Sequence, residues 1–393
     1  MVPKKVVIEK ADRLYQLPPE LAAFLPEKAR RSLIRKTPAT DLATFSWPIA
    51  FDEGDPAPPA RLGQADREQL ARLRSELAAW YQTRFGVRLH PDKEICIGGG
   101  VTILTMALAT AFVDRGDAVL VPEIGLPLYR RAAVACGGEP IVYRVSPKNG
   151  WQPDFEPLES RVGKAARLLF LNTPHNPTGA VLGERELGDL LALAARHQTG
   201  VINDAAYLTL APGRPASLLA LPGGRRNGAE IGSFSYLFGL PRLPLGFVAG
   251  NRDIISGVRH ALRLAPPFLP AYAVERAIAA VRQFPGEPLR RLQTAIAASR
   301  AEAVRLVDRL GLAVSGYDTV PFLWARLERR RSAAVAAGRL YLRGRILALP
   351  GTAFGDSGEG YLRFSLTAPA ELYAQAGERL RRRPHLLRPP EDS

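Results

Sequence analysis

The stretch that decides the fold is RLLFLNTPHNPTG, residues 167–179. After Arg167 it runs through four apolar residues, a pattern typical of a strand that is buried on both faces. Two proline-containing turns and a glycine follow, and these cannot continue a strand. Because open α/β sheets bind ligands at the carboxyl ends of their strands, we expect a rigid ligand-binding loop at residues 172–179.

Short apolar runs alternate with helical patterns on both sides of this strand. Leu70, Leu73, Leu77 and Trp80 recur at helical spacing, and Gly86 ends that helix. Further helices are expected from residue 101 to about 112 and over 128–136 and 185–196. Strands are predicted at 94–97, 118–121, 140–143, 167–171, 200–203, 231–235 and 245–249. This alternation predicts an α/β fold with a mostly parallel, doubly wound sheet.

The chain divides into four predicted parts. Residues 1–45 form an N-terminal arm, residues 46–285 the large sheet domain, and residues 384–393 a tail. Between them, residues 286–383 predict a smaller α+β domain. Its expected helices are 288–310, 332–340 and 369–382, and its expected strands are 321–325 and 361–365.

Composition narrows the possible functions. The chain has 393 residues, 53 basic and 38 acidic, with a net charge of +15. The arginines are dispersed and accompany no nucleic-acid motif, so we do not expect a nucleic-acid partner. Two cysteines cannot form a disulfide scaffold, no metal-site spacing is present, and no segment predicts a membrane span or secretory signal. We therefore expect a cytoplasmic protein, and note that no lysine follows Lys164.

Three further segments carry candidate chemistry. Residues 203–207 (NDAAY) place the acidic Asp204 at a strand end, and residues 233–241 (SFSYLFGLP) follow another strand. Residues 361–365 (YLRFS) place Arg363 inside an apolar strand, where a guanidinium needs a partner such as a ligand carboxylate. The turn at Gly98–Gly100 precedes a helix start that can bind an anion.

These motifs resemble the class I/II aminotransferases, which are fold type I pyridoxal-phosphate (PLP) enzymes. The resemblance spans about residues 65–370 and includes NTPHNPTG, NDAAY, SFSYLFGLP and YLRFSL. It implies a cofactor held through its ring, its phenolic oxygen and its phosphate, and a substrate carboxylate held by arginine. The positions that match these roles are Asn176 and Tyr207 (phenolic oxygen), Asp204 (ring nitrogen), Ser233, Gly100 and Val101 (phosphate) and Arg363 (substrate).

The sequence also departs from the family pattern. Tyr236 stands where the family has its Schiff-base lysine, and a phenol carries no amine. Pro244 stands at the phosphate-binding arginine, Val101 at a frequent hydroxyl, and Leu126 at the aromatic that stacks on the ring. From these substitutions we expect no PLP, or PLP or pyridoxamine phosphate bound weakly and noncovalently.

Several functions stay open on the sequence alone. The first is a repurposed enzyme without classical transamination, binding an amino-acid-like carboxylate through Arg363, with Tyr236 and Tyr207 as proton donors. The alternatives are a catalytically silent subunit that pairs with an active aminotransferase, an atypical enzyme with noncovalent PLP, and simple loss of activity. Tyr236 either acts as an acid or base or fills space, and Asn176 and Asp204 either bind a ligand or are structural. The family implies a homodimer, and a paralogue would allow a heterodimer.

Overall fold

The computed structural model describes residues 63–154, 166–327, 332–344 and 346–381. The predicted arm and the tail lie outside these residues. Among the described residues the chain forms two compact units. One comprises residues 63–295 with 316–321, and the other comprises residues 296–315 with 322–381. The four-part division of the chain stays a prediction.

The first unit is built on an eight-stranded sheet in the order β1-β8-β7-β6-β5-β2-β3-β4. Strands β3, β2, β5, β6 and β7 run parallel to one another. Strand β8 is antiparallel to both β7 and β1, and β4 is antiparallel to β3. The strands are β1 (Ile95–Gly98), β2 (Ala118–Pro122), β3 (Glu139–Val145), β4 (Pro153–Asp154), β5 (Leu168–Asn172), β6 (Gly200–Asp204), β7 (Gly228–Ser233) and β8 (Gly246–Gly250).

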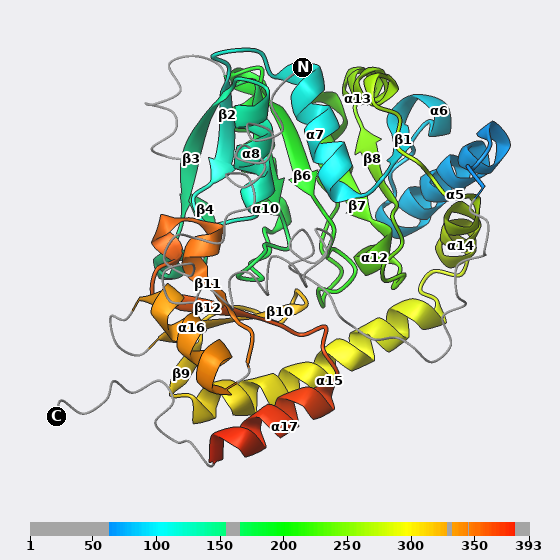
Figure 1. Ribbon diagram of the computed structural model, residues 1–393. Helices are drawn as coiled ribbons and strands as arrows, with labels where there is room; N and C mark the ends of the chain where they lie inside the picture. Colours follow the sequence, from blue (N-terminus) through cyan, green and yellow to red (C-terminus); the bar gives the residue numbers. More distant parts are fainter. Residues whose placement is uncertain (1–62, 155–165, 328–331, 345, 382–393) are drawn as a thin grey trace, which may run out of the picture. The chain divides into compact units, whose positions relative to one another are not determined.

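Helices accompany this sheet along the chain (Figure 1). They are α5 (Arg67–Phe85), α6 (Pro91–Glu94), α7 (Val101–Phe112), α8 (Pro127–Ala135), α10 (Glu184–Arg196), α11 (Gly224–Asn227), α12 (Phe234–Leu237), α13 (Arg252–Leu264) and α14 (Ala271–Arg282), with short 3-10 turns at Pro147–Asn149 and Leu218–Ala220. The α/β class and the largely parallel sheet are thus as predicted.

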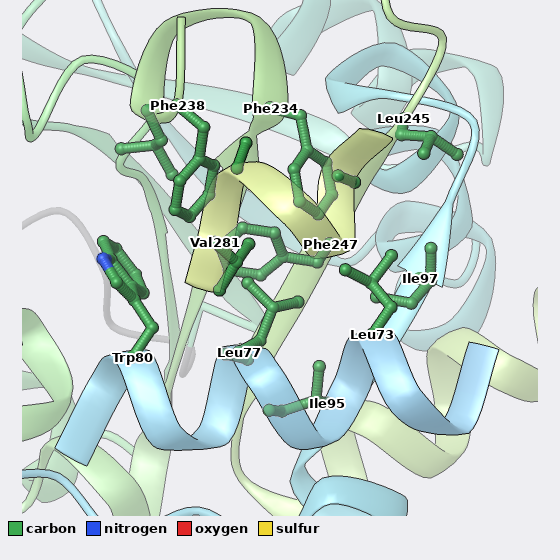
Figure 2. Packing of buried hydrophobic residues seen from close by; sticks show 14 of the residues in the cluster. Leu73, Leu77, Trp80, Ile95, Ile97, Phe234, Phe238, Leu245, Phe247 and Val281 are labelled. Carbon is green, nitrogen blue, oxygen red and sulfur yellow. The ribbon is translucent and has the colours of Figure 1, made fainter. Parts of the chain in front are cut away.

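Alternate residues of the strands enter two different cores, which is why the strand sequences are apolar on both faces. In β8, Phe247 and Ala249 pack with α5 and α14, whereas Val248 packs with α7, α8 and α13. Figure 2 shows the first core, where Trp80 and Leu77 of α5 face Phe238 and Phe247. Trp80 meets four aromatic rings edge-on, at centroid distances of 5.1–5.5 Å.

Helix α5 shows how local sequence fixes the ends of an element. Asp66 accepts a hydrogen bond from the Gln69 amide, and the Gln69 side chain accepts one from the Asp66 amide. This capping box begins the helix. Gly86 ends it with a φ of 73°, a left-handed conformation that glycine adopts at little cost. The two signals hold the helix that supplies Leu73, Leu77 and Trp80 to the core.

The second unit contains a four-stranded antiparallel sheet in the order β11-β12-β10-β9. Its strands are β9 (Leu312–Val314), β10 (Phe322–Leu327), β11 (Leu349–Pro350) and β12 (Tyr361–Ser365), and 3-10 turns lie at Gly351–Phe354 and Asp356–Gly358. Its helices are α16 (Ala333–Gly344), α17 (Ala370–Arg381) and the later part of α15 (Glu287–Arg309). In this unit Trp324 stacks on Tyr361.

Two features of the fold were not predicted. Helices α13 and α14 lie between the predicted strand 245–249 and the predicted helix 288–310, where no element was expected, and β8 runs against its neighbours. Only α12, a single helical turn, lies between β7 and β8, so the chain lacks the long helical crossover that a parallel return requires. No helix in the described residues is long and apolar enough to cross a membrane.

Candidate active site

Polar residues gather at the carboxyl ends of three adjacent parallel strands. Asn172 ends β5, Asp204 ends β6 and Ser233 ends β7, and Asn172 pairs in register with Asp204. All three are buried. Because ligands of open α/β sheets bind at this edge, the structure places the predicted candidates where a site is expected.

Asn172 joins two of these strand ends through its side chain. Its amide nitrogen donates to the backbone carbonyl of Asp204 at 2.7 Å and to that of Pro174 at 3.0 Å. Its oxygen accepts from the backbone N–H of Asn176 at 2.7 Å. The side chain therefore uses both amide hydrogens, and it fixes the main chain of two predicted cofactor residues, Asn176 and Asp204.

The carboxylate of Asp204 is buried yet held by few donors. The Tyr129 hydroxyl donates to Oδ2 at 2.7 Å, and the backbone N–H of Ala206 donates to Oδ1 at 3.1 Å. Burial raises the pKa of Asp204 to about 6, although both hydrogen bonds oppose that rise. Burial disfavours the charged form, so a nearby cation would be bound favourably here.

His175 shapes the turn that carries Asn176. Its ring lies within 2.8 Å of the Thr178 hydroxyl through Nδ1 and within 3.0 Å of the Ile124 carbonyl through Nε2. The carbonyl can only accept, so Nε2 carries the proton and Nδ1 accepts from Thr178. Burial lowers the pKa of His175 to about 4, which keeps the ring neutral. The sequence analysis singled out neither His175 nor Tyr129 as a site residue.

Tyr207 and Tyr236 lie together beside these strand ends. Their ring centroids are 4.9 Å apart with a 57° tilt, and both side chains are buried. Tyr236 belongs to α12, the helical turn that begins directly after Ser233. The Thr209 hydroxyl contacts the same turn, donating to the Leu237 carbonyl at 2.9 Å. The structure thus brings the two predicted phenols into contact.

The start of α7 provides backbone donors. Gly100 is its N-cap, with a φ of 95°, and the helix runs for 12 residues from Val101. The first amides of a helix lack intrahelical partners and carry the positive end of the helix dipole. Gly246 of β8 packs against this turn so closely that a Cβ there would lie 3.0 Å from the Gly100 Cα.

Arg363 belongs to the second unit and is described there by itself. It lies in β12, paired with Trp324, and only 2% of it is exposed. Its guanidinium carbon lies 3.9 Å from the ring centroid of Phe322 and 4.7 Å from that of Phe354. Both distances are within the range of a cation–π interaction, and the arginine expected inside an apolar strand is buried there.

The match to a family model decides what this fold and site belong to. Residues 58–380 match the model described as aminotransferase class I and II. The chain belongs to the class I and II aminotransferase family.

The alignments with curated relatives extend over most of the chain. An LL-diaminopimelate aminotransferase of Aquifex aeolicus is 28% identical over 395 residues, covering 95% of this chain and 99% of the relative. One of Dehalococcoides mccartyi is 32% identical over 322 residues, covering 80% and 81%. A solved structure, a probable N-succinyldiaminopimelate aminotransferase from Thermus thermophilus, is 26% identical, with a TM-score of 0.72 over 81% of this chain and 86% of that one.

These relatives correct two expectations drawn from the sequence. The expectation of a protein without classical transamination is contradicted, because the chain resembles aminotransferases along nearly its whole length. An absent or weakly bound cofactor is contradicted as well, because aminotransferases of this family depend on PLP. The physical reason is that strand ends and helix amides build most of the framework of the site, and these do not depend on residues 236 and 244. The four local substitutions therefore did not justify the expectation.

The chain's own residues fit PLP at its ring and phosphate ends. The buried Asp204 carboxylate suits a protonated ring nitrogen, and the free amides at the start of α7 suit a phosphate. The phenol of Tyr236 supplies no amine, and no lysine follows Lys164. That residue 236 corresponds to the family's lysine stays a prediction. Within the described ranges, no group of three or more His, Cys, Asp or Glu side chains could hold a metal ion.

Proposed function

We propose that this chain is an aminotransferase that uses PLP and acts on an amino acid, with LL-diaminopimelate as the first candidate donor. The observation that carries the proposal is the buried carboxylate of Asp204 at the carboxyl end of β6. It lies in register with Asn172, which also holds the Asn176 main chain. The names of the curated relatives support the choice of donor.

Each residue has a defined task in this proposal. PLP, when bound, supplies an electron-withdrawing ring that stabilises negative charge at the substrate's reacting carbon. Asp204 would keep a ring nitrogen protonated, and Asn176 and Tyr207 would donate to the phenolic oxygen. Ser233 and the amides from Gly100 and Val101 would hold the phosphate. These assignments follow the resemblance, and the burial of Asn176, Asp204, Tyr207 and Ser233 supports those made to them.

The paired phenols are the second part of the proposal. Tyr236 and Tyr207 are in ring contact and buried, so a proton passing through either hydroxyl would be shielded from bulk water. A positioned acid–base group contributes about 10²–10⁴-fold to a rate. We assign proton transfer to Tyr236, assisted by Tyr207.

Arg363 is proposed as the ligand of the substrate carboxylate. Its planar guanidinium can bind a carboxylate through two parallel hydrogen bonds, and the Phe322 and Phe354 rings already fix its orientation. The chain is further proposed to act as a cytoplasmic homodimer. Sedimentation equilibrium of the purified protein would test the dimer.

The test is a PLP titration followed by absorbance, coupled to an assay of amino transfer from LL-diaminopimelate to an oxo acid. We expect saturable PLP binding and transfer by the wild-type protein. Tyr236→Phe should keep PLP affinity but lower kcat by at least about 100-fold, because only the hydroxyl is lost.

Tyr236→Lys is the matched variant, because it restores an amine at the same position. We expect its PLP spectrum to change relative to the wild type, with binding at least as tight. The proposal is overturned if the wild type shows no saturable PLP binding and transfers no amino group from LL-diaminopimelate or from a panel of amino acids.

A further inference from the structure

A tyrosine outside the predicted set contacts the carboxylate of Asp204. Tyr129 lies in the first turn of α8, and its hydroxyl donates to Oδ2 of Asp204 at 2.7 Å. Both residues are buried. We propose that Tyr129 is a positioning residue, whose hydroxyl orients the Asp204 carboxylate and keeps it charged for a cationic ring nitrogen. This inference rests on the proposed function in so far as the ring belongs to PLP.

The Tyr129 ring is held rigidly, so its hydroxyl has one direction to point. The ring stacks on Phe170 with an interplanar angle of 10° and a centroid distance of 5.4 Å. Burial and the neighbouring Asp204 carboxylate raise the pKa of Tyr129 well above its ordinary value. The phenol therefore keeps its proton, and the contact is a donation to the carboxylate rather than the reverse.

The geometry leaves part of the carboxylate available. An ionised carboxylate accepts about four hydrogen bonds. Tyr129 and the Ala206 amide supply one each, on different oxygens, while Asn172 binds only the backbone carbonyl of Asp204. Two donors define the plane of the carboxylate, and about two acceptor positions remain for a ligand.

No cation within the described residues contributes to the raised pKa of Asp204, which reflects burial opposed by Tyr129 and Ala206. The titratable groups that face Tyr129, besides Asp204, are Tyr207 and Tyr143. Burial raises the pKa of Tyr143, so it too is neutral at working pH. Among the described residues, Tyr129 is thus the one side chain whose hydrogen bond stabilises the charged form of Asp204.

Tyr143 offers a matched control. It is buried like Tyr129, and its hydroxyl donates at 2.9 Å to the backbone carbonyl of Phe170, the residue on which Tyr129 stacks. Tyr129→Phe and Tyr143→Phe each delete one buried hydroxyl in the same region. Only the first deletion removes a donor from Asp204.

The first measurement needs no cofactor. Infrared spectra of PLP-free protein labelled with ¹³C in aspartate carboxyl groups, minus spectra of Asp204→Asn, follow the titration of Asp204. Losing one donor to a charged group should raise its midpoint by about one pH unit in Tyr129→Phe. Tyr143→Phe should titrate like the wild type. The proposal is wrong if Tyr129→Phe leaves the midpoint unchanged or if both variants shift it equally.

The second measurement uses PLP and its 1-deaza analogue, in which a C–H replaces the ring nitrogen. Tyr129→Phe should weaken PLP binding by about 10-fold while leaving the affinity for the analogue within about twofold of the wild type. Equal losses for both ligands would overturn the assignment to the ring nitrogen. If the wild type binds neither ligand, the proposed function fails, whereas the infrared titration still decides the role of Tyr129.

Discussion

Two buried carboxylates on adjacent strands have opposite surroundings. Asp204, at the end of β6, receives hydrogen bonds from Tyr129 and from the Ala206 amide. Glu230, three residues inside the end of β7, accepts from four donors. They are the hydroxyls of Tyr81 (3.1 Å) and Ser217 (2.7 Å), the Leu218 amide (2.7 Å) and the Asn203 side chain (3.4 Å).

The difference in hydrogen-bond donors marks Glu230 as a structural acid and Asp204 as one available to a ligand. Four donors match the acceptor capacity of a carboxylate, so Glu230 is satisfied by the protein alone. It ties α5, β6 and the turn at Leu218–Ala220 to the sheet. Asp204 keeps acceptor capacity and lies at the strand edge, so its burial is compensated only in part. Each of the following experiments tests this contrast.

The largest effect is expected from Asp204→Asn. Asparagine nearly keeps the shape but carries no charge, so a protonated ring nitrogen loses its partner. We expect kcat/KM for amino transfer to fall by about 10³-fold, measured at saturating PLP. At neutral pH the free energy of unfolding should not fall below that of the wild type, because few protein donors lose a partner and a buried charge is removed. Activity within tenfold of the wild type would contradict the assignment.

Glu230→Leu should show the reverse pattern. The substitution leaves up to four buried donors without an acceptor, at about 1–3 kcal/mol each before relaxation. We expect the free energy of unfolding, measured in urea, to fall by about 3–5 kcal/mol. kcat per folded molecule should hardly change. Glu230→Gln, which keeps one acceptor oxygen, is the control and should lose less stability.

The pH dependence of stability should distinguish Asp204 directly. Its folded-state pKa is raised from 3.8 to about 6, so the folded protein binds more protons than the unfolded chain between these values. Stability is therefore lost as pH rises through this window. Relative to Asp204→Asn, the wild type should lose about 2–3 kcal/mol between about pH 4 and pH 6. If urea denaturation gives the same stability difference between the wild type and Asp204→Asn at every pH in this range, the assignment is wrong.

The smallest effect is expected from Ser217→Ala, which removes one of the four donors to Glu230. Three donors remain, so we expect a loss of about 1 kcal/mol in unfolding free energy. PLP affinity and kcat should be unchanged. A marked loss of activity in this variant would show that the two carboxylates are coupled, and the contrast between them would not hold.

Much of the fold could be predicted from the sequence because each signal was local. The apolar run at 168–171 and the turn after it needed no distant partner to be recognised. Helix α13 was missed, although Asn251 caps it by accepting from the Asp253 and Ile254 amides. The direction of β8 could not be read, because an apolar strand has the same pattern whichever way it runs.

Residues of the site could be predicted only where their place in the sequence puts them at the end of a predicted strand. Asp204 could be placed at a strand end, but Tyr129 lies 75 residues away in sequence, and no periodicity reveals that contact. Glu230 escaped notice because the predicted strand began one residue later. The expectation of lost transamination was wrong because departures at residues 236 and 244 were read without the retained framework around them.

The placement of the tryptophans gives each unit its own optical probe. Trp80 is buried in the α5 core of the sheet unit, and its indole N–H has no hydrogen-bond partner in the described structure. Trp324 is buried in the other unit, stacked on Tyr361. The chain has two further tryptophans, Trp47 and Trp151. With both replaced by phenylalanine, fluorescence of Trp80→Phe and Trp324→Phe variants would report separately on how each unit melts.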